Sequence, residues 1–414
     1  MESMGKIRSS WDLYVEEALG KLESRKKFAP LRPMNASMAG QEEGAQTNLD
    51  EDEYETYQGI QPWDRLASQI QLPQIFFQRL MAGLELTSKN EREEHEIISS
   101  NQEKKFKKLT LFAGNDFLGL SRHPTIAKAM AKAAMEQGTG PRGSPLVCGY
   151  TNYHMALESA LANLKKKEVL ELQFATIGGQ PRKFSDALNH ASIVDGLKIA
   201  EQQGGVELSV YKHCDMSHLD ALLTKCKNKR KVVVTDSLFS MDGDIAPMGE
   251  LAHLRQKHGF LWVLDDAHGT FAWGKNGGGL AEEFNCEYDV DLCVGTLSKA
   301  ASSLGGFVAC SKIWKQWIQS RGRSFFFSTI APIPLVAASY VSICHLLREF
   351  LQAGFYCVAV GPPAVPPKTA RIRLTLTAVQ TTEDIKRLAA LISKYVKFQV
   401  PSYIDSSNYT SARL

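Results

Sequence analysis

The sequence predicts an α/β fold built on a mostly parallel sheet, and two observations support this. First, apolar runs alternate with helical segments after residue 230: KVVVTD, MGELAHLRQKHG, FLWVLD and VDLCVGT follow one another. Strands that are apolar on both faces are typical of parallel sheets covered by helices on both sides. Second, each apolar run ends in polar residues, and such sheets bind ligands beyond the carboxyl ends of their strands. The polar residues expected at those ends are Ser240, Asp265, His268, Thr296 and Lys299.

The composition is that of an ordinary globular protein and excludes several classes. Hydrophobic residues make up 44% and charged residues 22% of the 414 positions, which is enough for a sizeable core. The net charge of +3 and the lack of arginine-rich runs give no reason to expect nucleic acid as a partner. The eight cysteines contain no CxxC pair and no zinc-ligand spacing. We therefore expect reduced thiols in an intracellular compartment and no metal site.

Neither end of the chain carries a clear membrane signal. The N-terminal segment lacks an apolar core and contains acidic residues, so neither a signal peptide nor a transit peptide fits. The run 324–347 has no charged residue, but Ser, Thr and Pro fill its first half, which favours a buried loop that enters a helix over a membrane span.

The C-terminal Ala412-Arg413-Leu414 resembles an SKL-type peroxisomal address. The alternatives are an ordinary tail and a cytosolic location.

Helix and linker signals suggest three regions. Apolar residues recur with helical spacing over 11–32, whereas 36–62 is rich in Gly, Glu and Gln and has the composition of a linker. The segment HPTIAKAMAKAAMEQG predicts a helix that His-Pro opens and Gly138 closes. We expect an N-terminal helix and acidic linker over 1–110, a large ligand-binding domain over 111–330 and a reduced small domain over 331–414.

A single lysine, Lys299, lies among small residues in GTLSKAASSLGG. Dehydration by close neighbours lowers the pKa of an ammonium group, and a neutral amine can attack a carbonyl to form an imine. The alternative is a lysine that caps a glycine-rich turn. The surrounding motifs have to distinguish the two interpretations.

Two further motifs supply partners for Lys299. In FLWVLDDAHGT, Asp265 ends an apolar strand and His268 follows three residues later. A carboxylate there can pair with a protonated ring nitrogen and a histidine with a phenolic oxygen, and pyridoxal phosphate presents both on one ring. The alternative is that Asp265 and Asp266 cap a helix. In DALNHASIVDG, His190 is placed to stack on a flat ring, or is an ordinary loop histidine.

Taken together, these motifs resemble the α-oxoamine synthases, pyridoxal-phosphate enzymes of aminotransferase fold type I. The resemblance runs from Trp11 to about Asp384. It is carried, in family order, by NDFLGL, GSPLVCGYTNYH, NHAS, FSMDGD, DDAHG, TLSK, FSTIAPIP and RIRLTLTA. The resemblance implies a fold type I large domain, a homodimer and pyridoxal 5'-phosphate as cofactor.

The resemblance also implies a role for each matched residue. Lys299 would hold the cofactor as an imine, Asp265 would keep the pyridine nitrogen protonated, and His190 would stack on the ring. His268 and Ser240 would contact the phenolic oxygen. Thr296, and Thr329 from a partner subunit, would help to hold the phosphate. The residues expected to bind substrate are Arg32, Asn115 and Arg373.

Within the family, RIRLTLTA, CGYTNYH and SRKKFAPLR resemble the biotin-biosynthetic branch, and GPRGSPLVCGY resembles its plant members, which are peroxisomal. This branch would condense L-alanine with a pimeloyl thioester and release carbon dioxide and the free thiol. No nucleic acid or membrane partner is implied.

The sequence departs from the family in three intervals. The family's glycine-aromatic phosphate loop is missing between 165 and 186, where only Gly178 and Gly179 are available as a replacement. HLLREF runs directly into LQAGFYCVAVGPP, which leaves a short small domain. Gly361 and Ala364 stand where the family has a substrate-binding Arg and Thr. Two alternatives stay open: a non-catalytic paralogue or splice product that dimerises with an intact synthase, and a synthase for another acyl thioester.

Overall fold

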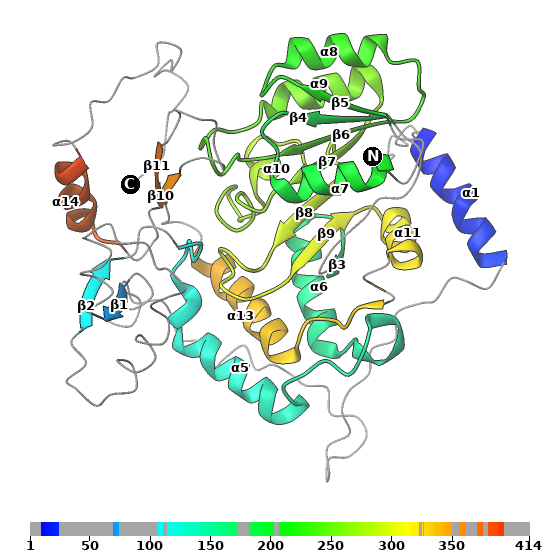
Figure 1. Cartoon of the computed structure of the whole chain (residues 1–414). Helices are drawn as coiled ribbons and strands as arrows, with labels where there is room; N and C mark the ends of the chain where they lie inside the picture. The colour runs from blue at the N-terminus through cyan, green and yellow to red at the C-terminus, as the bar shows by residue number, and fades with distance from the viewer. Residues whose placement is uncertain are drawn as a thin grey trace, which may run out of the picture.

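The computed structural model describes residues 10–24, 69–73, 106–110, 114–171, 182–202, 207–322, 325, 327–349, 356–360, 371–375 and 380–392. A seven-stranded sheet forms its centre, in the strand order β3-β9-β8-β7-β6-β4-β5 (Figure 1). The pairs β8-β7, β7-β6, β6-β4 and β4-β5 are parallel, whereas β9 is antiparallel to both of its neighbours. The predicted mostly parallel α/β sheet is confirmed. The strands are β3 (Glu168–Glu171), β4 (Arg182–Asp186), β5 (Leu208–Tyr211), β6 (Lys231–Asp236), β7 (Leu261–Asp265), β8 (Leu292–Thr296) and β9 (Gly306–Cys310).

The near-continuous apolar strands divide their side chains between two cores. Trp262 and Leu264 of β7 belong to one buried cluster, and their neighbours Leu261 and Val263 belong to the other. This alternation follows from the two-residue period of a strand. Helices cover both faces, as the sequence predicted. The first cluster packs against α5 (Pro124–Gln137), α6 (Asn152–Lys165), α8 (Met216–Lys225), α9 (Met248–His258), α10 (Leu280–Glu283) and α13 (Ile333–Glu349).

The second face carries fewer helices, and aromatic residues dominate its core. Trp11 of α1 (Ser10–Ser24) lies 6.1 Å from Trp314 of α11 (Lys312–Arg321), measured between ring centroids. Leu197 of α7 (Ala191–Gln202) packs into the same cluster. The predicted helix at the N-terminus is confirmed over 10–24, and the remainder of the expected range lies outside the described residues.

Local signals placed the ends of α5 correctly. The Nδ1 atom of His123 accepts a hydrogen bond from the N–H of Thr125, Pro124 occupies the first helical position, and Gly138 follows the last turn with a φ of 86°. Proline suits the first turn because its missing N–H would have no helical partner, and glycine adopts positive φ without strain. Two short helical turns, Leu120–Arg122 and the π-turn Pro145–Gly149, flank this helix.

The remaining elements belong to the ends of the chain. β1 (Gln69–Pro73) pairs antiparallel with β2 (Phe106–Thr110), and β10 (Tyr356–Val360) pairs antiparallel with β11 (Arg371–Thr375). Figure 1 shows both pairs and α14 (Thr382–Ile392) to one side of the seven-stranded sheet. The uncharged run 324–347 enters α13 at Ile333, as predicted. Across the described parts of the chain, no helix combines the length and apolarity that crossing a membrane requires.

Candidate active site

Four parallel strands bring their carboxyl ends to one edge of the sheet, and each ends in a polar residue. These residues are Asp186 of β4, Asp236 of β6, Asp265 of β7 and Thr296 of β8. Asp236 and Asp265 are register partners on adjacent strands. The predicted edge of the sheet therefore carries three aspartates and one threonine at the ends of these strands.

Lys299 and His268 meet at this edge from different loops. The Nζ atom of Lys299 lies 2.9 Å from Nε2 of His268, within hydrogen-bond distance, and both side chains are half-buried. Phe117 packs its ring against the His268 ring, with centroids 5.8 Å apart and planes tilted by 34°. The lysine is thus held by a specific partner inside the site, which favours the site interpretation over a solvent-exposed turn cap.

Two carboxyl groups lie beside this lysine in a setting that disfavours their charge. Burial raises the pKa of Asp265 above its ordinary value, while the N–H of Ala267 and the charge of Lys299 oppose the shift. Burial, together with the neighbouring charge of Asp265, raises the pKa of Asp236 to about 7. A cationic group placed at this edge would relieve the repulsion between the two carboxylates.

Asp266 is turned away from the site and anchors the loop that carries Asp265 and His268. It is fully buried and pairs with Lys165, whose Nζ lies 2.9 Å from its Oδ2. Burial alone would lower the pKa of Lys165, but the charge and hydrogen bond of Asp266, together with the charges of Cys293 and Glu282, outweigh burial and raise it. Ser237 and Thr270 also donate to the carboxylate, at 2.7 and 3.0 Å. Asp265 accepts from the N–H of Ala267 in a turn, whereas Oδ1 of Asp266 also accepts from the N–H of Leu280, the first residue of α10, so the helix-cap alternative holds in part for Asp266 and not for Asp265.

His190 reaches the edge through its backbone. Its N–H donates to Oδ2 of Asp236 at 2.7 Å, and its ring Nδ1 lies 2.8 Å from the Ser192 hydroxyl. The ring is exposed and lies between β4 and α7, where the sequence placed it. An exposed flat ring held from one side by Ser192 is free to cover a planar ligand.

The structure also describes four further residues that the sequence predicts for the site: Thr296, Asn115, Ser240 and Thr329. Thr296 contacts the Ser298 hydroxyl at 2.7 Å and donates to the carbonyl of Gly305 at 3.2 Å. Asn115 is exposed in a turn that reaches the Lys299 loop, because the Ser302 hydroxyl donates to the neighbouring Asp116. Ser240 is half-buried beyond β6, and Thr329 is exposed.

Several predictions cannot be followed to a side-chain position. Arg373 lies in β11, and the structure describes its strand but not its side chain. Arg32, the glycines at 178 and 179, and the positions 361 and 364 lie outside the described residues. Only ten residues, 172–181, separate β3 from β4, in agreement with the short interval seen in the sequence.

Sequence reasoning missed two residues that the structure brings into or behind the site. Asp236 ends β6, so the rule that polar residues at strand ends form the site was sufficient to find it. Lys165 belongs to the run KKK, and nothing in the sequence distinguishes it from the adjacent lysines. Only the approach of α6 to the Asp266 loop reveals its role.

The donor set fits pyridoxal phosphate. Proteins bind and tune this cofactor with an amine that can form an imine, a buried carboxylate that can pair with the pyridinium nitrogen, and nearby histidines. Burial and the charge of Asp265 disfavour the ionised form of Asp236, and a protonated ring nitrogen at this edge would offset both effects. The sheet and the site together define the class of pyridoxal-phosphate-dependent transferases of fold type I.

Comparison with known proteins identifies the family within this class. Residues 107–343 match the family model described as aminotransferase class I and II, and the chain belongs to this family. It is 47% identical to the 8-amino-7-oxononanoate synthase of Arabidopsis thaliana, over 95% of this chain and 98% of the relative. It is 33% identical to the 8-amino-7-oxononanoate synthase of Geobacter sulfurreducens, over 70% of this chain and 90% of the relative.

Solved structures show the same fold. A serine palmitoyltransferase from S. paucimobilis with bound PLP–myriocin superposes with a TM-score of 0.64 at 25% identity, over 70% of this chain and 87% of that one. An 8-amino-7-oxononanoate synthase from Francisella tularensis superposes with a TM-score of 0.57 at 20% identity, over 68% and 96% of the two chains.

The alignment with the Arabidopsis relative also shows that this chain is shorter within the matched region. The alignment spans 469 positions, and 95% of 414 residues fills about 393 of them, which leaves about 76 positions to the relative alone. The match to the family model ends at residue 343, next to the junction at HLLREF. This chain is therefore shorter than the Arabidopsis relative, in agreement with the shortened intervals noted in the sequence.

Proposed function

We propose that this chain is an 8-amino-7-oxononanoate synthase that condenses L-alanine with a pimeloyl thioester, with pyridoxal phosphate as its cofactor. The identity of 47% over 98% of the Arabidopsis synthase is the observation that carries this proposal. The reaction forms a carbon–carbon bond between the amino acid and the acyl group, and releases carbon dioxide and the free thiol. It belongs to biotin biosynthesis.

The cofactor, when bound, supplies an electron sink for the carbanion that forms at the α-carbon of alanine. Lys299 would hold the cofactor, and its amine would be placed to take and return a proton. His268, 2.9 Å from Nζ, accepts a hydrogen bond from the lysine and orients it. Asp265 would provide the negative charge that keeps the ring nitrogen of the cofactor protonated.

The remaining residues orient and enclose the reactants. His190 would cover the planar ring of the cofactor, and Asp236 fixes the histidine backbone by accepting from its N–H. Thr296 with the partner's Thr329, and the Gly178-Gly179 segment, are assigned to the phosphate group. Arg32, Asn115 and Arg373 are assigned to substrate carboxyl and carbonyl groups, because an arginine suits a carboxylate. Ser240 is assigned to the phenolic oxygen, and the active form is a homodimer.

Peroxisomal import through Ala412-Arg413-Leu414 is part of the same proposal. These residues lie outside the described part of the chain, and the support is the tripeptide itself.

A second candidate function is that of a non-catalytic partner which pairs with an intact synthase. The observation that favours it is the shortening by about 76 of the 469 aligned positions. A synthase for a different acyl thioester is the third alternative, supported by the structural similarity to serine palmitoyltransferase.

Absorption spectroscopy of the purified chain with pyridoxal phosphate tests these candidates. We expect a visible imine band that borohydride traps, that Lys299→Ala abolishes and that Lys275→Ala retains, because Lys275 is an exposed lysine away from the site. Alanine with pimeloyl thioester then tests turnover, with serine and palmitoyl thioester as the competing pair. No band dependent on Lys299 would exclude the synthase and favour the non-catalytic partner.

A further inference from the structure

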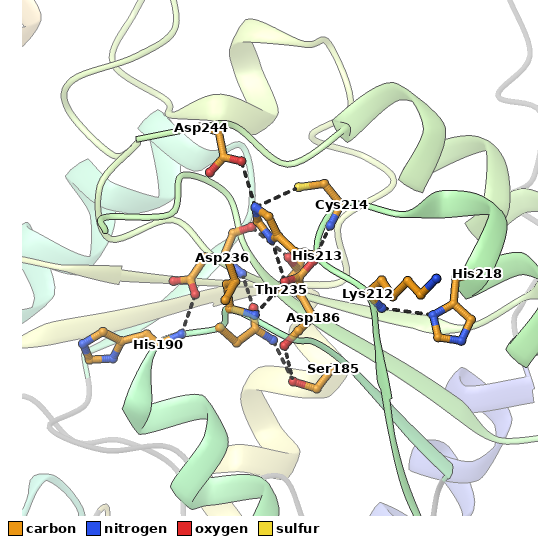
Figure 2. A network of polar contacts seen from close by, with 12 residues as sticks. Ser185, Asp186, His190, Lys212, His213, Cys214, His218, Thr235, Asp236 and Asp244 are labelled. Atoms are coloured by element: carbon orange, nitrogen blue, oxygen red, sulfur yellow. Dashed lines mark hydrogen bonds and ion pairs between the residues drawn. The ribbon is translucent and has the colours of Figure 1, made fainter. Parts of the chain in front are cut away.

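A second group of polar side chains lies at the end of β4 and in the loop after β5. It consists of Asp186, His213, Cys214 and Asp244, shown in Figure 2. One ligand atom from each of Asp186, His213 and Cys214 lies within 4.8 Å of the other two. None of these four residues has a part in the reaction proposed above.

The histidine ring is placed between two carboxylates and beside a thiol. Its Nδ1 atom lies 2.8 Å from Oδ1 of Asp186, and its Nε2 atom lies 2.8 Å from Oδ2 of Asp244. The Sγ atom of Cys214 lies 3.7 Å from the same Nε2 atom. Figure 2 shows the Asp244 and Cys214 side chains converging on the Nε2 edge of the ring. A carboxylate oxygen and a sulfur atom thus both lie close to the same imidazole nitrogen.

The group is held rigidly from its buried side. Asp186 is 2% exposed and accepts from the N–H groups of Leu188 and Cys214 as well as contacting His213. The ring of buried Phe239 packs edge-on against the His213 ring, with centroids 4.5 Å apart. Asp186 on Nδ1 leaves Nε2 as the outward atom, which is the arrangement that orients metal-binding histidines in proteins.

The charges around the thiol favour a cation. Burial, followed by the charges of Asp186, Asp244 and Asp242, raises the pKa of the Cys214 thiol to about 12. Burial opposes the protonation of His213, but contacts with Asp186 and Asp244 outweigh it and raise its pKa. Three carboxylates thus surround the thiol, and a bound divalent cation would offset their charge.

We infer that this cluster is a binding site for a zinc-like divalent transition metal, held by Nε2 of His213, Sγ of Cys214 and the carboxylate of Asp244. Asp186 orients the histidine as a second-sphere partner. Sulfur, imidazole and carboxylate are the ligands that Zn²⁺ takes in proteins, whereas Mg²⁺ and Ca²⁺ require oxygen. On binding, the Cys214 thiol releases one proton and its thiolate forms the metal–sulfur bond, while a protonated His213 releases the proton on Nε2 as this atom binds the metal; water fills the fourth position.

This site would also connect to the catalytic edge. Asp186 ends β4 and accepts from Leu188 in the turn that leads to His190, and the His190 N–H in turn contacts Asp236. A metal that fixes His213 and Asp186 would therefore stabilise the turn that positions His190. The inference itself does not depend on the proposed reaction.

Metal titration of the full-length chain loaded with pyridoxal phosphate tests the site. Equilibrium dialysis with Zn²⁺ alone is expected to give one ion per chain. Co²⁺ is expected to give the visible ligand-field bands of a tetrahedral thiolate site. Cys214→Ser should abolish these bands and weaken Zn²⁺ binding by at least about 100-fold, since it removes the only sulfur ligand. Asp244→Asn should weaken Zn²⁺ binding by about 10-fold or more, since it removes a charged ligand.

Cys226→Ser is the matched control, because Cys226 is another partly buried free cysteine, at the end of α8. It should bind both metals as the parent does. Circular dichroism shows whether Cys214→Ser is folded, and Asp244→Asn, at an exposed position, gives a second test. Cobalt spectra that are equal in the Cys214→Ser and Cys226→Ser variants, or displacement of Zn²⁺ by an equal concentration of Mg²⁺, would overturn the inference. In that case His213 is an imidazolium that bridges Asp186 and Asp244.

Discussion

The Nζ atom of Lys165 lies 2.9 Å from Oδ2 of Asp266, and both side chains are almost completely buried behind the loop that carries Asp265 and His268. The lysine also donates to the Thr270 hydroxyl and to the carbonyl of Gly278, each at 2.8 Å. These bonds fix the loop that carries the two proposed site residues.

Lys165→Met is expected to destabilise the chain by about 3–5 kcal/mol, because it leaves the Asp266 charge buried without a partner. Chemical denaturation measures the free energy of unfolding. The adjacent Lys166→Met is the control: Lys166 pairs with Glu287 near the surface at 2.7 Å, and exposed pairs contribute about 0–1 kcal/mol. Equal losses of unfolding free energy in the two variants would show that the buried ion pair stabilises the chain no more than the surface pair does.

Gly279→Ala is expected to disturb the same loop from the other side. Gly279 has a φ of 89°, and an added Cβ would overlap the Asp266 carboxylate. The positive φ and the overpacking together predict a loss of about 2–5 kcal/mol. Gly196→Ala, in α7 with open space around it, should instead gain up to about 1 kcal/mol. Thermal unfolding of the two variants gives the comparison, and a neutral Gly279→Ala would contradict the packing.

The pH dependence of stability before cofactor is added should depend on Asp236. Its pKa is about 7 in the folded chain and about 3.9 in an unfolded one, so between these values the native state binds more protons. The free energy of unfolding therefore falls as pH rises from about 4 to 7. Asp236→Asn should reduce this slope, to which Asp265 also contributes, and raise stability above pH 7 by up to about 4 kcal/mol, with no gain below pH 4.

Denaturation at pH 4 and pH 8 measures this difference. Asp195→Asn, at an exposed position of α7, is the control and should leave the slope unchanged. A reduced slope in both variants, or in neither, would show that Asp236 is not the group responsible.

Asp265→Asn is expected to weaken pyridoxal phosphate binding by about 10- to 150-fold, since it removes one charge-assisted hydrogen bond of about 1.5–3 kcal/mol. Fluorescence titration with the cofactor gives the dissociation constant. Glu250→Gln, at an exposed position of α9, should bind the cofactor as the parent does. An unchanged constant in Asp265→Asn would mean that this carboxylate does not face the ring nitrogen.

The sequence alone determined the class of fold and most of the site. Apolar strands such as FLWVLD must be covered on both faces, and the polar residues that follow them, Asp265 and Thr296, must then lie at one edge of a parallel sheet. Caps and turns are also local: His123, Pro124 and Gly138 set the ends of α5 because capping depends only on neighbouring residues.

Only the tertiary structure decided which of several chemically equal residues take part in the buried ion pairs and polar clusters. Lys165 differs from Lys166 in that one faces the buried Asp266 and the other faces Glu287, a difference set by how α6 docks on the sheet. His213 and Asp244 are 31 residues apart in sequence and meet only because the loops after β5 and β6 lie side by side. Electrostatic strength depends on distance and burial, and a sequence pattern contains neither quantity.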